Sequence, residues 1–299
     1  MRIACAAFLG ATSEVVVGGR KPFFYTYDTA SGAVAKLPVL AGCKGLKSHE
    51  VMCASPSGLR VAFAGAGGYV HVVCGRLKTW QLDVKMNCAC RAIAFVDDHT
   101  LVSSGLDADV YVWDLRQLPG AAASGALGRC VARFHNEDGT CTSAVAASLC
   151  AQLQGTVFGP RPVPSSSSGG RAGNTYFAVG SESGVVALYY ADLSASVAGG
   201  RGGGGGVRPL KALMNLTTKV TCAAFHPSGE LLAVASDQKK DQLKLVHLPS
   251  GTVYANWPTE KTPLRKVTAL AFSPGGGFLA VGNDKGRVLL YRLVHYQSA

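Results

Sequence analysis

Residues 266–293 read KVTALAFSPGGGFLAVGNDKGRVLLYRL. Apolar and polar residues alternate in three short runs, and Ser, Pro, Gly and Asn separate these runs. Such alternation, rich in β-branched and aromatic residues, is typical of short antiparallel strands. The stretch therefore predicts strands at 267–272, 278–281 and 287–293.

The same pattern occurs one unit earlier, where residues 219–248 read KVTCAAFHPSGELLAVASDQKKDQLKLVHL. Phe225 and Phe272 hold equivalent places and lie 47 residues apart. A repeat of about 40–45 residues with several strands per unit is the sign of a WD-repeat propeller blade. The one literal Trp-Asp pair, Trp113-Asp114, ends a further copy of the pattern.

The repeat predicts an all-β fold, a WD-repeat β-propeller with six recognisable blades of a probable seven, in one domain over residues 1–299. The predicted blades cover residues 1–42, 43–87, 88–135, 136–218, 219–262 and 263–299. Two low-complexity segments, 159–174 and 194–209, lengthen the fourth blade. Tracts of Gly, Ser and Pro bury little apolar surface, so both segments are predicted to be mobile surface loops.

The last predicted blade has no outer strand of its own, because only VHYQSA follows Leu293. Propellers commonly remove their free sheet edges by closing the ring. The first blade begins near Ala4 with an inner strand, so no part of this sequence supplies the missing strand. We therefore expect that this chain alone does not close the ring and that the N-terminal part of the natural protein is absent.

The formal net charge is +11. A basic surface suits partners with negative charge, such as RNA or an acidic protein, although it also favours solubility. No apolar run approaches the roughly 18–20 residues that a membrane helix needs, so we expect a soluble protein without a membrane partner. The N-terminal MRIACAAFLGA resembles a short signal peptide, but it also aligns with the strand at 267–272, which we favour.

The ten cysteines show no C-x-x-C spacing. This pattern favours free thiols in a reducing compartment over disulfides or a zinc site. Four of them are expected to act as small apolar fillers in inner strands: Cys5, Cys53, Cys90 and Cys222.

Motifs of catalysis are weak throughout the sequence. Residues 180–184, GSESG, resemble a nucleophile elbow but place Glu182 where the serine is needed. The histidines are scattered without metal-ligand spacing, and Asp107 and Asp109 fit a polar turn better than a catalytic carboxylate pair. We predict no enzyme, cofactor, metal or small-molecule substrate. A phosphoesterase or another propeller enzyme is the alternative that a bound metal would support.

Several large aromatic residues fall at predicted core positions, namely Phe95, Phe225, Phe272 and Tyr291, and Trp80 on the predicted outer strand of the second blade is also expected to be buried. They are therefore not expected to offer exposed platforms on which bases stack.

Two local motifs suggest interaction residues. Trp113, Asp114 and Arg116 form a WD-x-R box, which resembles the one by which some propellers dock onto cullin-type ubiquitin ligase adaptors. Arg201 and Arg208 flank the tract RGGGGGVR, which resembles an RGG-type RNA-binding segment. An ordinary blade end and a flexible insertion explain the same residues, so both alternatives stay open.

Residues 213–258, from LMNL through SDQKKDQLKLVHLPSGTV to NWP, depart from a generic WD repeat. With AFSPGGGFLAVGNDKGRVLLYRLVHY at the end, they resemble a family of nucleolar WD-repeat proteins associated with the U3 small nucleolar RNA. GGRKPFFYTYD, LPVLAGCKGLKSHE, GYVHVV and SGLDADVYVWDLR fit the same family in the same order. The resemblance spans residues 1–299.

This resemblance implies a non-catalytic scaffold of the small-subunit processome (the 90S pre-ribosome) in the nucleolus of the nucleus. Its implied role is ribosome biogenesis, with pre-rRNA processing and 18S rRNA maturation, and it implies no cofactor. The implied partners are other propeller proteins of the processome, with the U3 snoRNP and pre-rRNA close by. The family also has a further blade and an N-terminal extension, and the Ser- and Gly-rich insertions depart from it. The alternative function, which rests on Trp113 to Arg116, is a substrate receptor of a cullin-type ubiquitin ligase.

Overall fold

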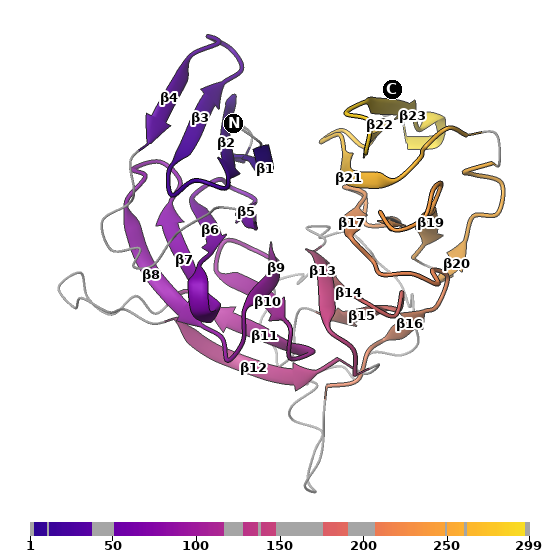
Figure 1. Ribbon diagram of the computed structural model, residues 1–299, viewed down its shortest axis with the longest axis horizontal. Helices are drawn as coiled ribbons and strands as arrows, with labels where there is room; N and C mark the ends of the chain where they lie inside the picture. The colour runs from indigo at the N-terminus through magenta and orange to yellow at the C-terminus, as the bar shows by residue number, and fades with distance from the viewer. Residues whose placement is uncertain are drawn as a thin grey trace, which may run out of the picture. The chain divides into compact units, whose positions relative to one another are not determined.

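The computed structural model divides the chain into two compact units, unit 1 at Met1–Phe134 and unit 2 at His135–Ala299. Both units are built from antiparallel sheets whose strands follow one another in chain order (Figure 1). The structure describes residues 3–10, 12–37, 51–116, 128–136, 139–147, 176–190, 207–248, 250–259 and 262–296.

The first three sheets each contain four strands. Each strand pairs with the next one in the chain, so every sheet is a meander. The strands are β1 (Ile3–Phe8), β2 (Glu14–Gly19), β3 (Phe24–Asp28) and β4 (Val34–Leu37); β5 (Met52–Ala54), β6 (Arg60–Ala64), β7 (Tyr69–Cys74) and β8 (Trp80–Lys85); and β9 (Cys90–Phe95), β10 (Thr100–Gly105), β11 (Asp109–Asp114) and β12 (Arg129–His135).

The remaining three sheets belong to unit 2, and the last of them contains three strands among the described residues. The strands are β13 (Thr142–Ala147), β14 (Tyr176–Ser181), β15 (Val186–Tyr190) and β16 (Lys211–Leu213); β17 (Cys222–Phe225), β18 (Leu231–Ala235), β19 (Leu243–His247) and β20 (Thr252–Val253); and β21 (Val267–Phe272), β22 (Phe278–Asn283) and β23 (Val288–Arg292).

These six sheets are six blades of a WD-repeat β-propeller, so the predicted all-β fold is confirmed. The strands predicted in the final repeat occur as β21, β22 and β23, and β22 runs two residues further than predicted. The N-terminal apolar segment forms β1, which pairs with β2. The blade boundaries, the single domain and the closure of the ring stay predictions.

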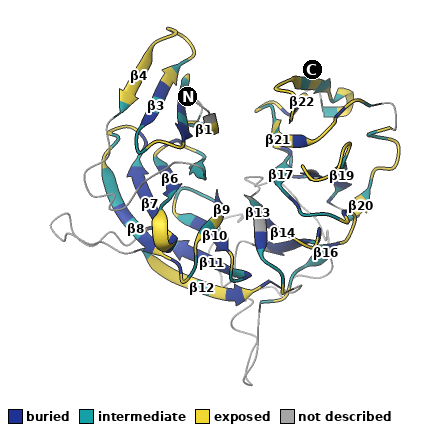
Figure 2. Cartoon of the chain, viewed as in Figure 1, coloured by how far each residue is buried: buried dark blue, intermediate teal, exposed yellow. Residues whose placement is uncertain are grey.

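The core of each unit lies between neighbouring blades. The first strands of successive blades lie against each other, β1 with β5 and β5 with β9 in unit 1, and β13 with β17 and β17 with β21 in unit 2. Figure 2 shows buried residues along much of β6, β7, β10 and β11, whereas the outer strand β4 is largely exposed. Burial is therefore greatest in the middle strands of a blade, and the first and outer strands are more exposed.

The structure refines several predictions about individual core residues. Phe95 is buried as predicted. Phe225, Phe272 and Tyr291 are only partly buried, although each packs against a core cluster. Trp80, which the sequence predicts to be buried, is also only partly buried, because it lies on the outer strand of its blade.

The two low-complexity segments fall where the sequence predicts, between the strands of the fourth sheet. Segment 159–174 separates β13 from β14 and lies outside the described residues. Segment 194–209 separates β15 from β16, and only its last three residues, 207–209, are described. Their predicted mobility stays a prediction.

Candidate functional site

The WD-x-R motif is mainly a structural element of the third blade. Trp113 is only 4% exposed, and its indole N–H donates a hydrogen bond to Ser103 Oγ at 2.8 Å. Its ring stacks on that of Tyr111 at 5.7 Å between centroids. A buried Trp whose N–H has found an acceptor is a packing residue, so Trp113 offers little surface to a partner.

Of the other predicted interaction residues, Asp114 is partly buried, and Arg116 and Arg208 are exposed. Asp114 accepts a hydrogen bond at Oδ1 from the backbone N–H of Arg116 at 2.9 Å, which fixes the turn after β11. Arg116 itself is exposed. Arg208 is exposed just before β16, and Arg201 lies outside the described residues.

Asp107 and Asp109 form a turn, as predicted. Asp107 Oδ1 accepts the backbone N–H of Asp109 at 3.3 Å, and Asp107 Oδ2 accepts the hydroxyl of Tyr111 at 2.9 Å. Asp109 pairs with Arg133, whose Nη2 lies 2.5 Å from Oδ2. Burial, followed by the hydrogen bond to Asp107, raises the pKa of Tyr111 to about 12. Both carboxylates therefore hold the blade together.

The four cysteines predicted as fillers all lie on the first strands of their blades, β1, β5, β9 and β17. Burial raises the pKa of Cys53 to about 11 and that of Cys90 to about 12. A thiol with such a pKa holds its proton at neutral pH and is a poor nucleophile or metal ligand. These two cysteines therefore act as apolar fillers.

A histidine-carboxylate pair lies inside the second blade. No motif in the sequence indicated this pair. His71 Nδ1 is 2.6 Å from Asp83 Oδ1, and the Trp80 indole N–H donates to the same oxygen at 2.7 Å. Such a pair resembles the base and the orienting acid of a catalytic triad. However, His71 is 1% exposed and its Nε2 lies beside Gly65, where an added Cβ would be 2.6 Å away. A substrate cannot reach this nitrogen, so the pair is structural.

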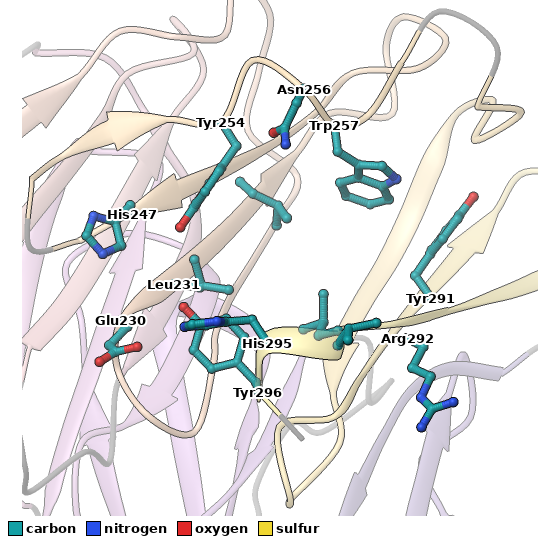
Figure 3. A pocket seen from close by; sticks show the side chains of 13 residues that line it. Glu230, Leu231, His247, Tyr254, Asn256, Trp257, Tyr291, Arg292, His295 and Tyr296 are labelled. Carbon is teal, nitrogen blue, oxygen red and sulfur yellow. The ribbon is translucent and has the colours of Figure 1, made fainter. Parts of the chain in front are cut away.

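A cleft with a volume of about 660 Å³ lies between the fifth and sixth blades. Its aromatic walls include Trp257 and Tyr291, whose rings meet edge to face at 5.0 Å. Figure 3 shows Tyr254, Trp257 and Tyr291 around the open space, with Glu230 and Tyr296 at its other side. Burial, followed by the negative charge of Glu230, raises the pKa of Tyr296. The cleft is thus an apolar groove with a polar end.

The repeat explains why this cleft exists. In the second blade, Trp80 of the outer strand β8 packs against the core shared with the first blade. In the fifth blade, Val253 of the outer strand β20 packs against the core shared with the fourth. Among the described residues the sixth blade ends at β23, so no corresponding side chain lies against Trp257 and Tyr291. The cleft therefore marks the position that an outer strand occupies in other blades.

The described residues hold neither a cluster of metal ligands nor a membrane-spanning helix. No group of three or more His, Cys, Asp or Glu side chains there is arranged to hold a metal ion. Among the same residues, no helix has the length and apolar character needed to cross a bilayer.

The comparisons with known proteins agree with the fold. The family model "WD domain, G-beta repeat" matches residues 209–239 and 259–292, which run from β16 of the fourth blade through parts of the last two blades. A U3 small nucleolar RNA-associated protein 18 homolog of Arabidopsis thaliana is 36% identical over 295 residues, which cover 98% of this chain and 46% of that protein.

Similar relatives occur in animals and fungi. The human homolog of the same name is 33% identical over 279 residues, covering 92% of this chain and 42% of the relative. The U3 small nucleolar RNA-associated protein 18 of Saccharomyces cerevisiae is 50% identical over 123 residues, covering 41% of this chain and 20% of the relative. The chain thus spans about half the length of the plant and human relatives. On these grounds, the chain belongs to the family of U3 small nucleolar RNA-associated protein 18.

Proposed function

We propose that this protein is a non-catalytic interaction scaffold in ribosome biogenesis. In this proposal it is part of the small-subunit processome, acts in the nucleolus and is needed for pre-rRNA processing and 18S rRNA maturation. The observation that carries the proposal is the similarity along 98% of the chain to a protein named for its association with the U3 small nucleolar RNA.

The geometry of the blades supports a scaffold over an enzyme. The acidic, histidine and cysteine side chains that resemble catalytic groups are used within the blades. Asp107 and Asp109 hold a turn, the His71 pair is buried, and the filler thiols of Cys53 and Cys90 stay protonated. Propellers present rims, turns and blade edges to other molecules, which suits proposed partners such as other propeller proteins and a U3 particle.

Depletion of the protein in its own cells tests this function. We expect precursors of the small-subunit rRNA to accumulate and 18S rRNA to decrease, while the large-subunit rRNAs change less. A fluorescent fusion should gather in the nucleolus, and the protein should sediment with large pre-ribosomal particles. Normal pre-rRNA processing after complete depletion would refute the proposal.

The ubiquitin ligase receptor remains an untested alternative, and no relative's name favours it. In the WD-x-R motif on which this alternative rests, Arg116 is exposed and could contact an adaptor, whereas Trp113 is buried in the blade. A pulldown with the wild-type protein and an Arg116→Ala variant decides between the two functions. If the ligase adaptor does not co-purify with the wild-type protein, the alternative is eliminated.

A further inference from the structure

A second hollow in unit 2 has a very different lining from the aromatic cleft. It measures about 480 Å³ and lies at the end of the sixth blade where β22 turns into β23. Its lining consists of Pro263, Arg265, Asn283, Lys285, Arg287 and Leu289. Three of these residues are cations and none is a carboxylate, so we call this hollow the cationic cavity.

The backbone under Arg265 is firmly held. Arg265 has a positive φ of 59°. Its N–H donates to Asp241 Oδ1 at 2.7 Å, and the N–H of Asp241 donates back to the carbonyl of Arg265 at 2.8 Å. The Asp241 carboxylate thus accepts from the backbone of Arg265. The exposed Arg265 side chain makes no ion pair within the described part of the chain.

The backbone of the other two cations, Lys285 and Arg287, is held by the buried side-chain amide of Asn283. Asn283 is 7% exposed, and its Oδ1 accepts the backbone N–H groups of both Lys285 and Arg287, each at 3.1 Å. The N–H of Asn283 donates to the carbonyl of Arg287 at 3.0 Å, which closes the turn. Lys285 and Arg287 are exposed and, like Arg265, form no ion pair with any described carboxylate. The turn therefore holds fixed backbone positions from which two unpaired cations project.

In the fifth blade, the lysine equivalent to Lys266 is Lys219, and an ion pair with Glu182 neutralises it. Lys219 precedes the first strand of the fifth blade as Lys266 precedes that of the sixth, and its Nζ lies 3.0 Å from Glu182 Oε1. Around the cationic cavity, Lys266 and the neighbouring turn with Lys239 and Lys240 add further exposed positive charge. Asp237, Asp241 and Asp284 lie in the same turns and offset these three lysines, so the excess positive charge is that of Arg265, Lys285 and Arg287. The surface at this end of the blade is therefore suited to an anion.

The lining also indicates which anion. A guanidinium offers a planar fork of N–H donors that matches the oxygens of a phosphate group. The cavity has two such groups and an ammonium, but no aromatic side chain on which a base could stack. Contacts of this kind read the charged backbone of a nucleic acid and carry no sequence information.

We infer that Arg265, Lys285 and Arg287 form a binding site for the phosphodiester backbone of RNA. This inference rests on the proposed function, because that function places the protein beside nascent RNA. It goes beyond it by assigning direct, sequence-independent RNA contact to one turn of the sixth blade.

Fluorescence anisotropy of a labelled, mixed-sequence RNA of about 20 nucleotides tests the site. The purified chain is compared with the triple variant Arg265→Gln, Lys285→Gln, Arg287→Gln over a range of salt concentrations. Three lost phosphate contacts should reduce the slope of log affinity against log salt by about 2, which corresponds to a loss of about 100-fold at 0.1 M salt. A loss of less than about tenfold overturns the inference.

The control removes the same charge elsewhere, with Arg76→Gln, Arg91→Gln and Arg129→Gln in unit 1, all at exposed positions. This variant should keep its affinity for RNA within about threefold of the wild-type value. If it loses as much affinity as the first triple variant, net charge explains the effect and the inference is overturned. Far-ultraviolet circular dichroism checks that both triple variants fold. If the first does not, the single change Lys285→Glu at an exposed turn position replaces it, with the same tenfold criterion.

Three competitors separate binding of RNA from binding of other anions. Unlabelled RNA should displace the probe, whereas inorganic phosphate or poly-glutamate at equal charge should not. Displacement by poly-glutamate as effective as that by RNA would overturn the inference in favour of an acidic protein partner. If the triple variant loses RNA binding but still sediments with pre-ribosomal particles, the inference stands independently of the scaffold. If depletion leaves processing normal, the proposed function fails while the binding result remains.

Discussion

The first turns of the first two blades approach each other so closely that a single methyl group should disturb them. Gly58 has a φ of +74°, and a Cβ added there would lie 2.5 Å from the carbonyl carbon of Leu9 and 2.7 Å from the nitrogen of Gly10. These are backbone atoms, so they cannot rotate away as a flexible side chain would. Gly58→Ala therefore combines a strained φ with a clash between two blades.

The two costs can be separated with a matched glycine. Gly32 has a similar φ of +70°, but a Cβ added there meets nothing within 4 Å. A left-handed backbone costs a non-glycine residue about 1–2 kcal/mol, and overpacking adds about 1–3 kcal/mol. We expect Gly32→Ala to lower the free energy of unfolding by about 1 kcal/mol and Gly58→Ala to lower it by about 3 kcal/mol.

Urea unfolding measures this difference within one unit. In a Trp257→Phe background the remaining tryptophans, Trp80 and Trp113, both lie in unit 1 with the two glycines. Their fluorescence then reports only on that unit. Asn tolerates a left-handed backbone, so Gly32→Asn should be nearly neutral while Gly58→Asn should remain destabilising. Equal losses at the two positions would refute the close contact between the blades.

Three other predictions concern titration and the cleft. Because the folded pKa of Tyr111 is raised to about 12, its contribution to stability is complete below its unfolded pKa of about 10 and is lost as the pH rises toward 12; ultraviolet absorbance follows its ionisation, which Asp107→Asn should shift to lower pH. The hydroxyl of Ser13 is the largest cause that lowers the pKa of Asp28 to about 2, so Ser13→Ala should raise that pKa in a carboxyl NMR titration, and an unchanged value would contradict the contact. Trp257→Ala should lower the free energy of unfolding of unit 2 by about 2 kcal/mol, less than the roughly 3–5 kcal/mol of a fully buried Trp, as measured by circular dichroism in urea.

The alternation of residues predicted the strands because each strand of a blade has inward and outward faces that repeat every second residue. It predicted the six blades and the three strands of the last sheet for the same reason. Turn chemistry could also be predicted, since Asp107 bonds the backbone two residues later wherever such a turn forms. These features depend on residues that are close together in the chain.

Features that join distant residues could not be predicted in this way. His71 and Asp83 lie on adjacent strands, and only the register of β7 against β8 brings them opposite each other. The approach of Gly58 to Leu9 depends on how two blades pack, which a pattern within either blade does not specify. Burial of outer-strand residues such as Trp80 was overestimated because alternation indicates which face a residue occupies but not whether another layer covers it.

The cationic cavity and the aromatic cleft show how one repeat acquires two different surfaces. Both include side chains of β23, Leu289 in the cavity and Tyr291 in the cleft. These residues are two apart, so they share one face of the strand. What differs is the neighbouring segment, with Arg265 beside the cavity and Trp257 beside the cleft. The connection from the fifth blade to the sixth therefore contributes one residue to each hollow, and a substitution at Arg265 or Trp257 should change one hollow without the other.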